Sequence, residues 1–132
     1  MALVRIEILT GRSEQEKRQL LVAVHDAVVA ALHVPRGDPV LRIVEHNPGN
    51  IARPSVPHPT TERYTLVEIT MFAGRSQDAK RALYQNIVRR LGELGTAPQD
   101  VTIVLLESPR CNWGVHGGQP ADEVDLGFQV EI

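Results

Sequence analysis

The chain has little of several residue types, and each shortage argues against a class of function. Cys111 is the only cysteine among 132 residues, so an internal disulfide is excluded. A catalytic role for its thiol would require a base nearby in the fold, and we expect no such role. The five histidines show no metal-ligand spacing, and no glycine-rich phosphate loop is present. We therefore expect chemistry that uses no metal and no other cofactor.

The net charge is small, and long apolar runs are absent. The formal net charge is −2, and no basic cluster is interleaved with aromatic residues. This composition gives no electrostatic basis for binding nucleic acid. No apolar stretch approaches the length of a membrane span, and the first residues lack the pattern of a signal peptide. We expect a cytoplasmic protein that binds neither nucleic acid nor membranes.

What the sequence does contain is a repeat. The segment GRSEQEKRQL at 11–20 returns as GRSQDAKRAL at 74–83, a displacement of 63 residues in which six of the ten positions are identical. Apolar residues before and after the segment match at the same displacement. Self-similarity at a fixed period is typical of a fold that is built from repeated units. Nearly half of the chain is therefore a copy of the other half.

Each copy is predicted to fold as a strand, a helix and a second strand. The first strand of each copy alternates apolar and polar residues, which is the period of a half-buried strand. Ser13 and Ser76 are the predicted helix N-caps, and apolar stripes at helical spacing follow both of them. An apolar run closes each copy as a strand parallel to the first. The predicted strands are 3–9, 40–45, 66–71 and 101–106.

These elements predict one α/β (α+β) domain over residues 1–132. Two tandem β-α-β units contribute four strands to one sheet, with two helices on one of its faces. The units are 1–46 and 64–107. Residues 47–63 contain four prolines and little periodicity, so we interpret them as a linker. Residues 108–132 are expected to form a C-terminal hairpin or tail.

Two kinds of position could carry chemistry. Arg12 and Arg75 each stand in a strand-to-helix turn, where free N–H groups and a guanidinium favour a bound carboxylate. The simpler interpretation is a solvated arginine beside a cap. The other position is the amino terminus, because the first strand begins at once and places the amine at an end of the sheet. The ordinary pKa of such an amine is about 7.7–8.0, and burial or nearby cations would lower it.

Several motifs together resemble the tautomerase superfamily. They are the strand at the second residue, the ILTGRS turn of residues 8–13, the repeated β-α-β unit and the closing NWGVHGG of residues 112–118. Short members such as 4-oxalocrotonate tautomerase are single β-α-β units. This chain is similar to the fused members, such as malonate semialdehyde decarboxylase and cis-3-chloroacrylic acid dehalogenase. The resemblance implies a tautomerase or MIF-like fold and a homotrimer of the fused chain.

The resemblance also implies roles for particular residues. In such proteins an N-terminal proline, exposed when the initiator methionine is removed, shuttles a proton, and arginines bind the carboxylate of a small substrate. Arg75 is placed at the site that contains the amine, and Arg12 falls in the degenerate half, where Thr65 stands at the position equivalent to Ala2. Asp38 matches the acidic residue that assists the amine or activates water. The remaining matches are the aromatic pocket wall, Trp113, and two pocket-edge candidates, His116 and Arg42.

The chain departs from the family pattern at its start and at its second turn. It opens Met1-Ala2-Leu3, so alanine stands where the proline is expected, and the amine left by methionine removal would be primary. A primary amine could also form an imine with an aldehyde or a ketone. At the second turn Ala73 replaces one of two expected arginines, which would weaken carboxylate binding.

Three functions follow from these observations. The first is a weak keto-enol tautomerase for small 2-oxo or enol acids, in which the Ala2 amine moves a proton, Arg75 holds the carboxylate and Asp38 assists. Related decarboxylase or dehalogenase and hydratase chemistry belongs with this hypothesis. The alternative is a non-catalytic trimeric relative that binds a small acid, and a methionine side chain in the pocket would favour it. The third is a ferredoxin-like regulatory module, in which the repeated turn would have no purpose.

Overall fold

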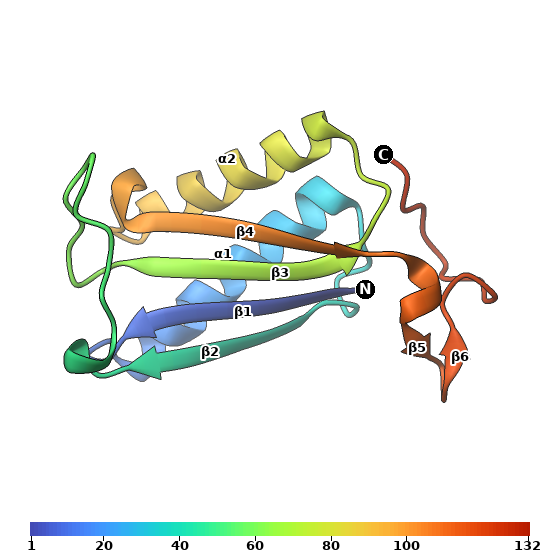
Figure 1. Ribbon diagram of the computed structural model, residues 1–132, viewed down its shortest axis with the longest axis horizontal. Coiled ribbons are helices and arrows are strands. Elements are labelled where there is room, and N and C mark those ends of the chain that lie inside the picture. Colours follow the sequence, from blue (N-terminus) through green and yellow to red (C-terminus); the bar gives the residue numbers. More distant parts are fainter.

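The computed structural model describes residues 1–132, and two helices cover one face of a four-stranded sheet (Figure 1). This arrangement confirms the predicted fold class. Each predicted strand is present, and all four extend by one or two residues beyond the predicted limits. The first unit consists of β1 (Ala2–Leu9), α1 (Glu14–Leu32) and β2 (Val40–His46), and the second of β3 (Thr65–Phe72), α2 (Gln77–Glu93) and β4 (Val101–Ser108).

The strand order of the sheet is β2-β1-β3-β4. Pairing is parallel within each unit, between β1 and β2 and between β3 and β4, and antiparallel between the central strands β1 and β3. In the central pair Ala2 lies opposite Met71, and Ile8 lies opposite Thr65. The turn after β3 therefore lies beside the start of β1, and the turn after β1 lies beside the start of β3. The repeat thus produces two equivalent corners at opposite ends of the sheet.

The repeated turn sequence explains how both helices begin. The Ser13 hydroxyl accepts the N–H of Glu16 at 3.1 Å, and the Glu16 carboxylate accepts the N–H of Ser13 at 3.3 Å, which completes a capping box. Ser76 accepts the equivalent backbone bond at 3.1 Å. Gly11 and Gly74 have φ values of 120° and 126°, a region that side chains with a Cβ rarely adopt. The glycine reverses the chain, and the serine then fixes the start of the helix.

The main core lies between the helices and the sheet and contains 17 buried residues. They come mainly from the inward faces of β1 and β3 and from the apolar stripes of the two helices. Burial of each large aliphatic side chain contributes about 1.5–3 kcal/mol to the stability of the fold. The packed layer therefore holds the strands and helices, and with them both corners, in fixed positions. Its largest fully buried side chains are Ile6, Ile8, Leu20, Leu32, Ile69, Met71, Leu83, Ile87 and Leu91.

The opposite face of the sheet carries no helix. Val40, Val104 and Leu106 are apolar, yet their exposed fractions are 47%, 39% and 49%. An ion pair between Arg5 and Glu68, at 3.1 Å, lies on the same face. Exposed apolar residues that gather on one face are typical of an interaction surface.

The remaining segments lie at the two ends of the sheet (Figure 1). The linker between the units contains a 3-10 turn, η1 (Pro48–Asn50), and is anchored where Thr61 donates two hydrogen bonds to the buried Asp100, at 2.7 and 2.6 Å. At the other end, the hairpin of β5 (Gly114–Val115) and β6 (Gln119–Pro120) precedes the C-terminal tail. The other 3-10 turns are η2 (Pro98–Asp100) and η3 (Arg110–Asn112). Neither α-helix combines the length and the apolar character needed to cross a membrane.

Candidate functional site

The start of β1 is the corner where predicted site residues meet. The loop before β2 reaches it because β2 runs parallel to β1, and the turn after β3 reaches it because β3 runs antiparallel. We call this place the amine corner and define it by Met1, Asp38, Arg75 and Trp113. In Figure 1 the N-terminus lies at the end of the sheet where β3 ends and the β5–β6 hairpin follows β4.

The amino group of the amine corner is paired with a carboxylate. The Met1 nitrogen lies 2.9 Å from Asp38 Oδ2. Burial lowers the pKa of this amine and outweighs the hydrogen bond and the charge of Asp38, which raise it; the charge of Arg75 lowers it further. A lower pKa increases the neutral fraction of the amine near neutral pH, and the neutral form is the one that accepts a proton.

Arg75 is a buried arginine whose guanidinium is mostly unpaired. Its exposed fraction is 5%, and Nη1 donates a hydrogen bond to the Phe72 carbonyl at 3.0 Å. Nε and Nη2 are buried and have no hydrogen-bond partner in the chain. Burial lowers the pKa of Arg75, against the charges of Asp38, Glu107 and Glu131, which raise it. Unpaired buried donors are costly, and a carboxylate that accepts both N–H groups would satisfy them.

Aromatic residues form the wall of the amine corner. The rings of Phe72 and Trp113 meet edge to face, with centroids 4.8 Å apart and an angle of 73°. The Trp113 indole nitrogen is buried and also has no hydrogen-bond partner. Met1 packs, together with Trp113, against a small buried cluster made of Phe72, Ala121 and Val130. The corner therefore combines an amine, a carboxylate, unpaired N–H donors and an apolar wall.

Three predicted site residues contribute no side chain to the amine corner. Ala2 is fully buried in β1, and its nitrogen belongs to the peptide bond with Met1, so the amine in this structure is that of Met1. The predicted role of Ala2 therefore concerns a chain from which Met1 has been removed. Arg42 is exposed in β2 and stands in register with Arg5. His116 is exposed at the β5–β6 turn, where its carbonyl accepts a hydrogen bond from Gln119 at 3.2 Å. Neither side chain bonds to the amine corner.

Sequence reasoning missed Phe72, whose carbonyl fixes Arg75 and whose ring packs on Trp113. The predicted strand stopped at Met71, one residue too early. A signal was present, because Phe72 follows the alternating strand directly and precedes the repeated turn. The contribution of Val130, which is 58 positions further along the chain, has no local signal.

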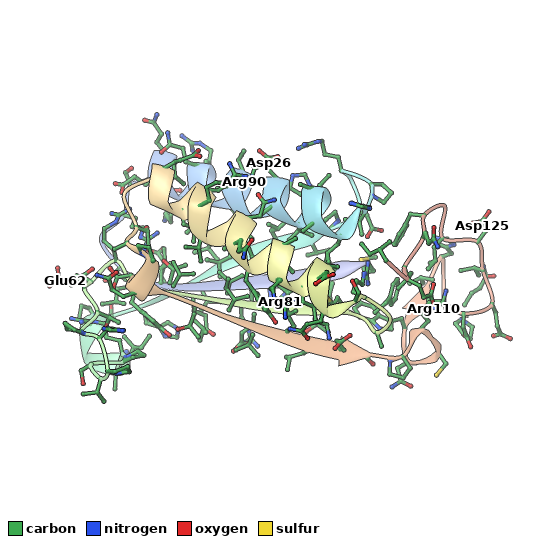
Figure 2. The ribbon with its side chains drawn as sticks, turned by 90° about the horizontal axis from the view of Figure 1, so that it is seen from above. Asp26, Glu62, Arg81, Arg90, Arg110 and Asp125 are labelled. Carbon is green, nitrogen blue, oxygen red and sulfur yellow. The ribbon has the colours of Figure 1, made fainter.

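The second corner contains the other copy of the arginine, but its guanidinium is already paired. Arg12 Nη2 donates to the Arg63 carbonyl at 2.8 Å and to Thr65 Oγ1 at 3.0 Å. Burial and the charge of Arg63 lower the pKa of Arg12. Thr65 is fully buried inside the chain and supplies a hydroxyl instead of an amine. We call Arg12, Arg63 and Thr65 the threonine corner. Arg12 and Arg63 line a surface hollow together with Glu62. In Figure 2 the label of Glu62 marks this end of the molecule, and the label of Arg110 marks the opposite end.

One surface groove lies away from both corners. It has a volume of about 390 Å³ and runs between α1 and α2. Asp26 and Arg90 face each other across it, 3.8 Å apart, and both are labelled in Figure 2. No group of three or more His, Cys, Asp or Glu side chains is placed to hold a metal ion. The amine corner is therefore the place where reactive groups are concentrated.

Comparison with known families gives matches along most of the chain. A family model described as a tautomerase enzyme matches residues 38–116, and a second model with the same description matches residues 3–57. Together they span both β-α-β units. The first match alone covers more than half of the chain.

Individual proteins are similar over nearly their whole length. The probable tautomerase YrdN of Bacillus subtilis (strain 168) is 27% identical over 123 residues, which cover 90% of this chain and 94% of YrdN. The structure of FG41 malonate semialdehyde decarboxylase inhibited by 3-bromopropiolate has a TM-score of 0.82 and 27% identity, covering 89% of this chain and 92% of that one. The Q0 fused 4-OT, a symmetric trimer, has a TM-score of 0.79 and 27% identity, covering 91% and 96%.

Proposed function

The chain belongs to the tautomerase superfamily, and from that premise we propose that it is a cofactor-free keto-enol tautomerase acting at the amine corner. Its substrates are small 2-oxo or enol carboxylic acids. Membership of this superfamily replaces the ferredoxin-like interpretation of the two β-α-β units. The terminal amine removes a proton beside the carbonyl group and returns it at another atom of the substrate.

The observation that carries this proposal is the state of Arg75. A guanidinium with an exposed fraction of 5% and two unpaired buried donors is costly unless an anion completes it. The terminal amine lies close enough for the charge of Arg75 to lower its pKa. A carboxylate bound by Arg75 would therefore hold the reacting carbons of a short acid beside the base.

The other residues of the amine corner suit the same reaction. Asp38 orients the amine through the 2.9 Å contact and would stabilise the ammonium that forms when the amine takes a proton. The unpaired indole N–H of Trp113 is a donor for the oxygen on which negative charge develops. The edge-to-face rings of Phe72 and Trp113 would exclude water from this side of the corner.

A second candidate function rests on the place of Met1. Its side chain packs beside Trp113 against the cluster of Phe72, Ala121 and Val130. A retained methionine would fill space that a substrate needs, which favours a protein that binds a small acid without turning it over. Removal of Met1 would transfer the amine to the Ala2 nitrogen and free that space.

We also propose that the protein is a homotrimer. The uncovered face of the sheet, with Val40, Val104 and Leu106 exposed, is the surface that three copies would bury together. The Q0 fused 4-OT, which is similar over nearly its whole length, is a symmetric trimer. Sedimentation equilibrium of the purified protein tests this assembly, and a monomeric mass across the concentration range would contradict it.

The test begins with untagged protein. Its intact mass reports whether Met1 is present, and ketonisation of phenylenolpyruvate by the same sample reports the activity. We expect a rate above that of buffer that Arg75→Ala removes and that Arg12→Ala, the matched change at the threonine corner, leaves in place. An equal response of the two variants would refute the assignment of the site. A rate equal to buffer, with retained Met1 and measurable acid binding, would establish the second candidate.

A further inference from the structure

The chain contains three primary amines, and two of them are held by carboxylates at the surface. Lys17 and Lys80 are the only lysines. Lys17 Nζ lies 2.8 Å from Glu14 and 3.0 Å from Glu45, and hydrogen bonds from both carboxylates raise the pKa of Lys17. Lys80 is paired with Glu107. The ammonium group of Lys17, stabilised in this way, is a poor nucleophile, because the lone pair of its nitrogen is bound to a proton.

The third amine, at the terminus, has different surroundings. Burial lowers its pKa, and the charge of Arg75 lowers it further, although Asp38 acts in the opposite direction. It lies 2.9 Å from the Asp38 carboxylate, which can take a proton from it. It also shares its corner with two unpaired guanidinium N–H donors that would bind a carboxylate. A neutral amine beside an anchored carbonyl compound is the arrangement in which amines add to carbonyl carbons.

We propose that the terminal amine forms an imine with small aldehydo- or 2-oxo-carboxylic acids that are anchored on Arg75. This inference rests on the proposed carboxylate site and adds a covalent step to it. The amine is primary whether it belongs to Met1 or, after methionine removal, to Ala2. A primary amine still holds a second hydrogen after it adds to the carbonyl, so it can complete a neutral imine.

The step balances without an oxidant or a reductant. The nitrogen lone pair forms a bond to the carbonyl carbon, and the electrons of the C=O π bond move to oxygen. Asp38 accepts a proton from nitrogen and returns it to this oxygen. The nitrogen lone pair then forms the C=N bond as water leaves, and the second proton of the nitrogen is lost. One amine and one carbonyl thus give one imine and one water.

The experiment traps the imine by reduction. The purified full-length chain is incubated with pyruvate and sodium cyanoborohydride, and the product is analysed by intact mass and peptide mapping. We expect one 1-carboxyethyl group on the residue that carries the terminal amine and none on Lys17 or Lys80. Acetone, a ketone that lacks the carboxylate, should label the terminus at least about tenfold less, because Arg75 cannot hold it.

Matched variants separate the anchor from the nucleophile. Arg75→Ala should reduce labelling by pyruvate to the level seen with acetone, while Arg12→Ala should label like the unaltered chain. A variant that carries Lys17→Arg and Lys80→Arg should gain the same single group. Far-ultraviolet circular dichroism of each variant confirms that it is folded before it is labelled.

The outcomes distinguish this inference from the proposed tautomerase. Ketonisation of phenylenolpyruvate without any N-terminal adduct would overturn the imine and leave the tautomerase standing. An adduct on the terminus that requires Arg75, in a protein that does not ketonise the enol, would support the imine and contradict the tautomerase. Labelling spread equally over the terminus and the two lysines would also overturn the inference, since the corner would then give no advantage.

Discussion

The two corners of this molecule are built from the same repeated sequence and differ in the hydrogen bonds that their arginines make. At the amine corner Arg75 donates one hydrogen bond, to Phe72, and keeps two buried donors unpaired. At the threonine corner the Arg12 guanidinium bonds both the Arg63 carbonyl and the Thr65 hydroxyl. The same turn therefore leaves buried donors unpaired at one end of the sheet and forms an internal brace at the other.

This difference shows which residues of the repeated turn determine the fold and which residue differs in its surroundings. The glycine and serine of the turn act alike at both corners, because each pair reverses the chain and caps a helix. The arginine acts differently because its neighbours differ. A chain end supplies an amine beside Arg75, whereas a mid-strand threonine and a linker carbonyl lie beside Arg12. The predictions below test how the two corners differ.

The largest expected effect is on turnover. Arg75→Ala should lower kcat/KM for phenylenolpyruvate by about 100-fold, because a charge-assisted pair of hydrogen bonds to the substrate carboxylate contributes about 1.5–3 kcal/mol. Arg12→Ala should stay within about twofold of the unaltered chain, since its guanidinium bonds only to the protein. Steady-state kinetics of the three proteins measures both numbers. Comparable losses in the two variants would mean that the corners are not functionally distinct.

The order of the two variants should reverse for stability, because Arg12→Ala should destabilise the fold more than Arg75→Ala does. Arg12→Ala leaves a buried threonine hydroxyl and a carbonyl without their donor and should cost about 1–3 kcal/mol in the free energy of unfolding. Arg75→Ala removes a buried charge with two unpaired donors and should cost less than about 1 kcal/mol. Urea unfolding followed by circular dichroism gives both values. A larger loss for Arg75→Ala would show that its guanidinium braces the fold as Arg12 does.

Much of the fold could be predicted because its signals are local. The alternation of the strands, the serine caps and the displacement of 63 residues between the two turns are all visible in the sequence. The family resemblance implied that Arg75 and Thr65 belong to different corners, and the antiparallel register of β1 and β3 places them at opposite ends of the sheet. The chemical roles of Ala2, Asp38, Arg75 and Trp113 remain predictions, which the experiments above test.

The details of the corners could not be predicted because they depend on contacts between distant segments. Arg63 was expected only as part of a linker, yet its carbonyl accepts a hydrogen bond from Arg12, 51 positions earlier. Val130, near the end of the chain, packs against Phe72 of β3. No local pattern encodes either contact. The two arginines differ in which of their donors are hydrogen-bonded within the chain, and this difference exists only in the folded structure.

The pH dependence of turnover tests how the amine corner tunes its base. Activity should rise with pH as the amine loses its proton, and burial moves this rise to a lower pH than for an exposed amine. Asp38 raises the pKa of the amine, so Asp38→Asn should shift the rise to lower pH. Arg75 lowers that pKa, so Arg75→Gln should shift the rise to higher pH. Profiles of kcat/KM measure both shifts, and shifts in the same direction would contradict the assignment of the amine as the base.

The smallest expected effect belongs to the threonine corner alone. Thr65 Oγ1 accepts a hydrogen bond from Arg12 at 3.0 Å and donates one to the Arg63 carbonyl at 3.0 Å. Thr65→Val keeps the shape of this fully buried side chain and removes both bonds, which should cost about 0.5–1.5 kcal/mol in urea unfolding. The rate of enol ketonisation should not change, because this corner lies at the opposite end of the sheet from the proposed site. A clear loss of rate at unchanged stability would show that the two ends of the sheet are coupled, and the division between brace and active site would then fail.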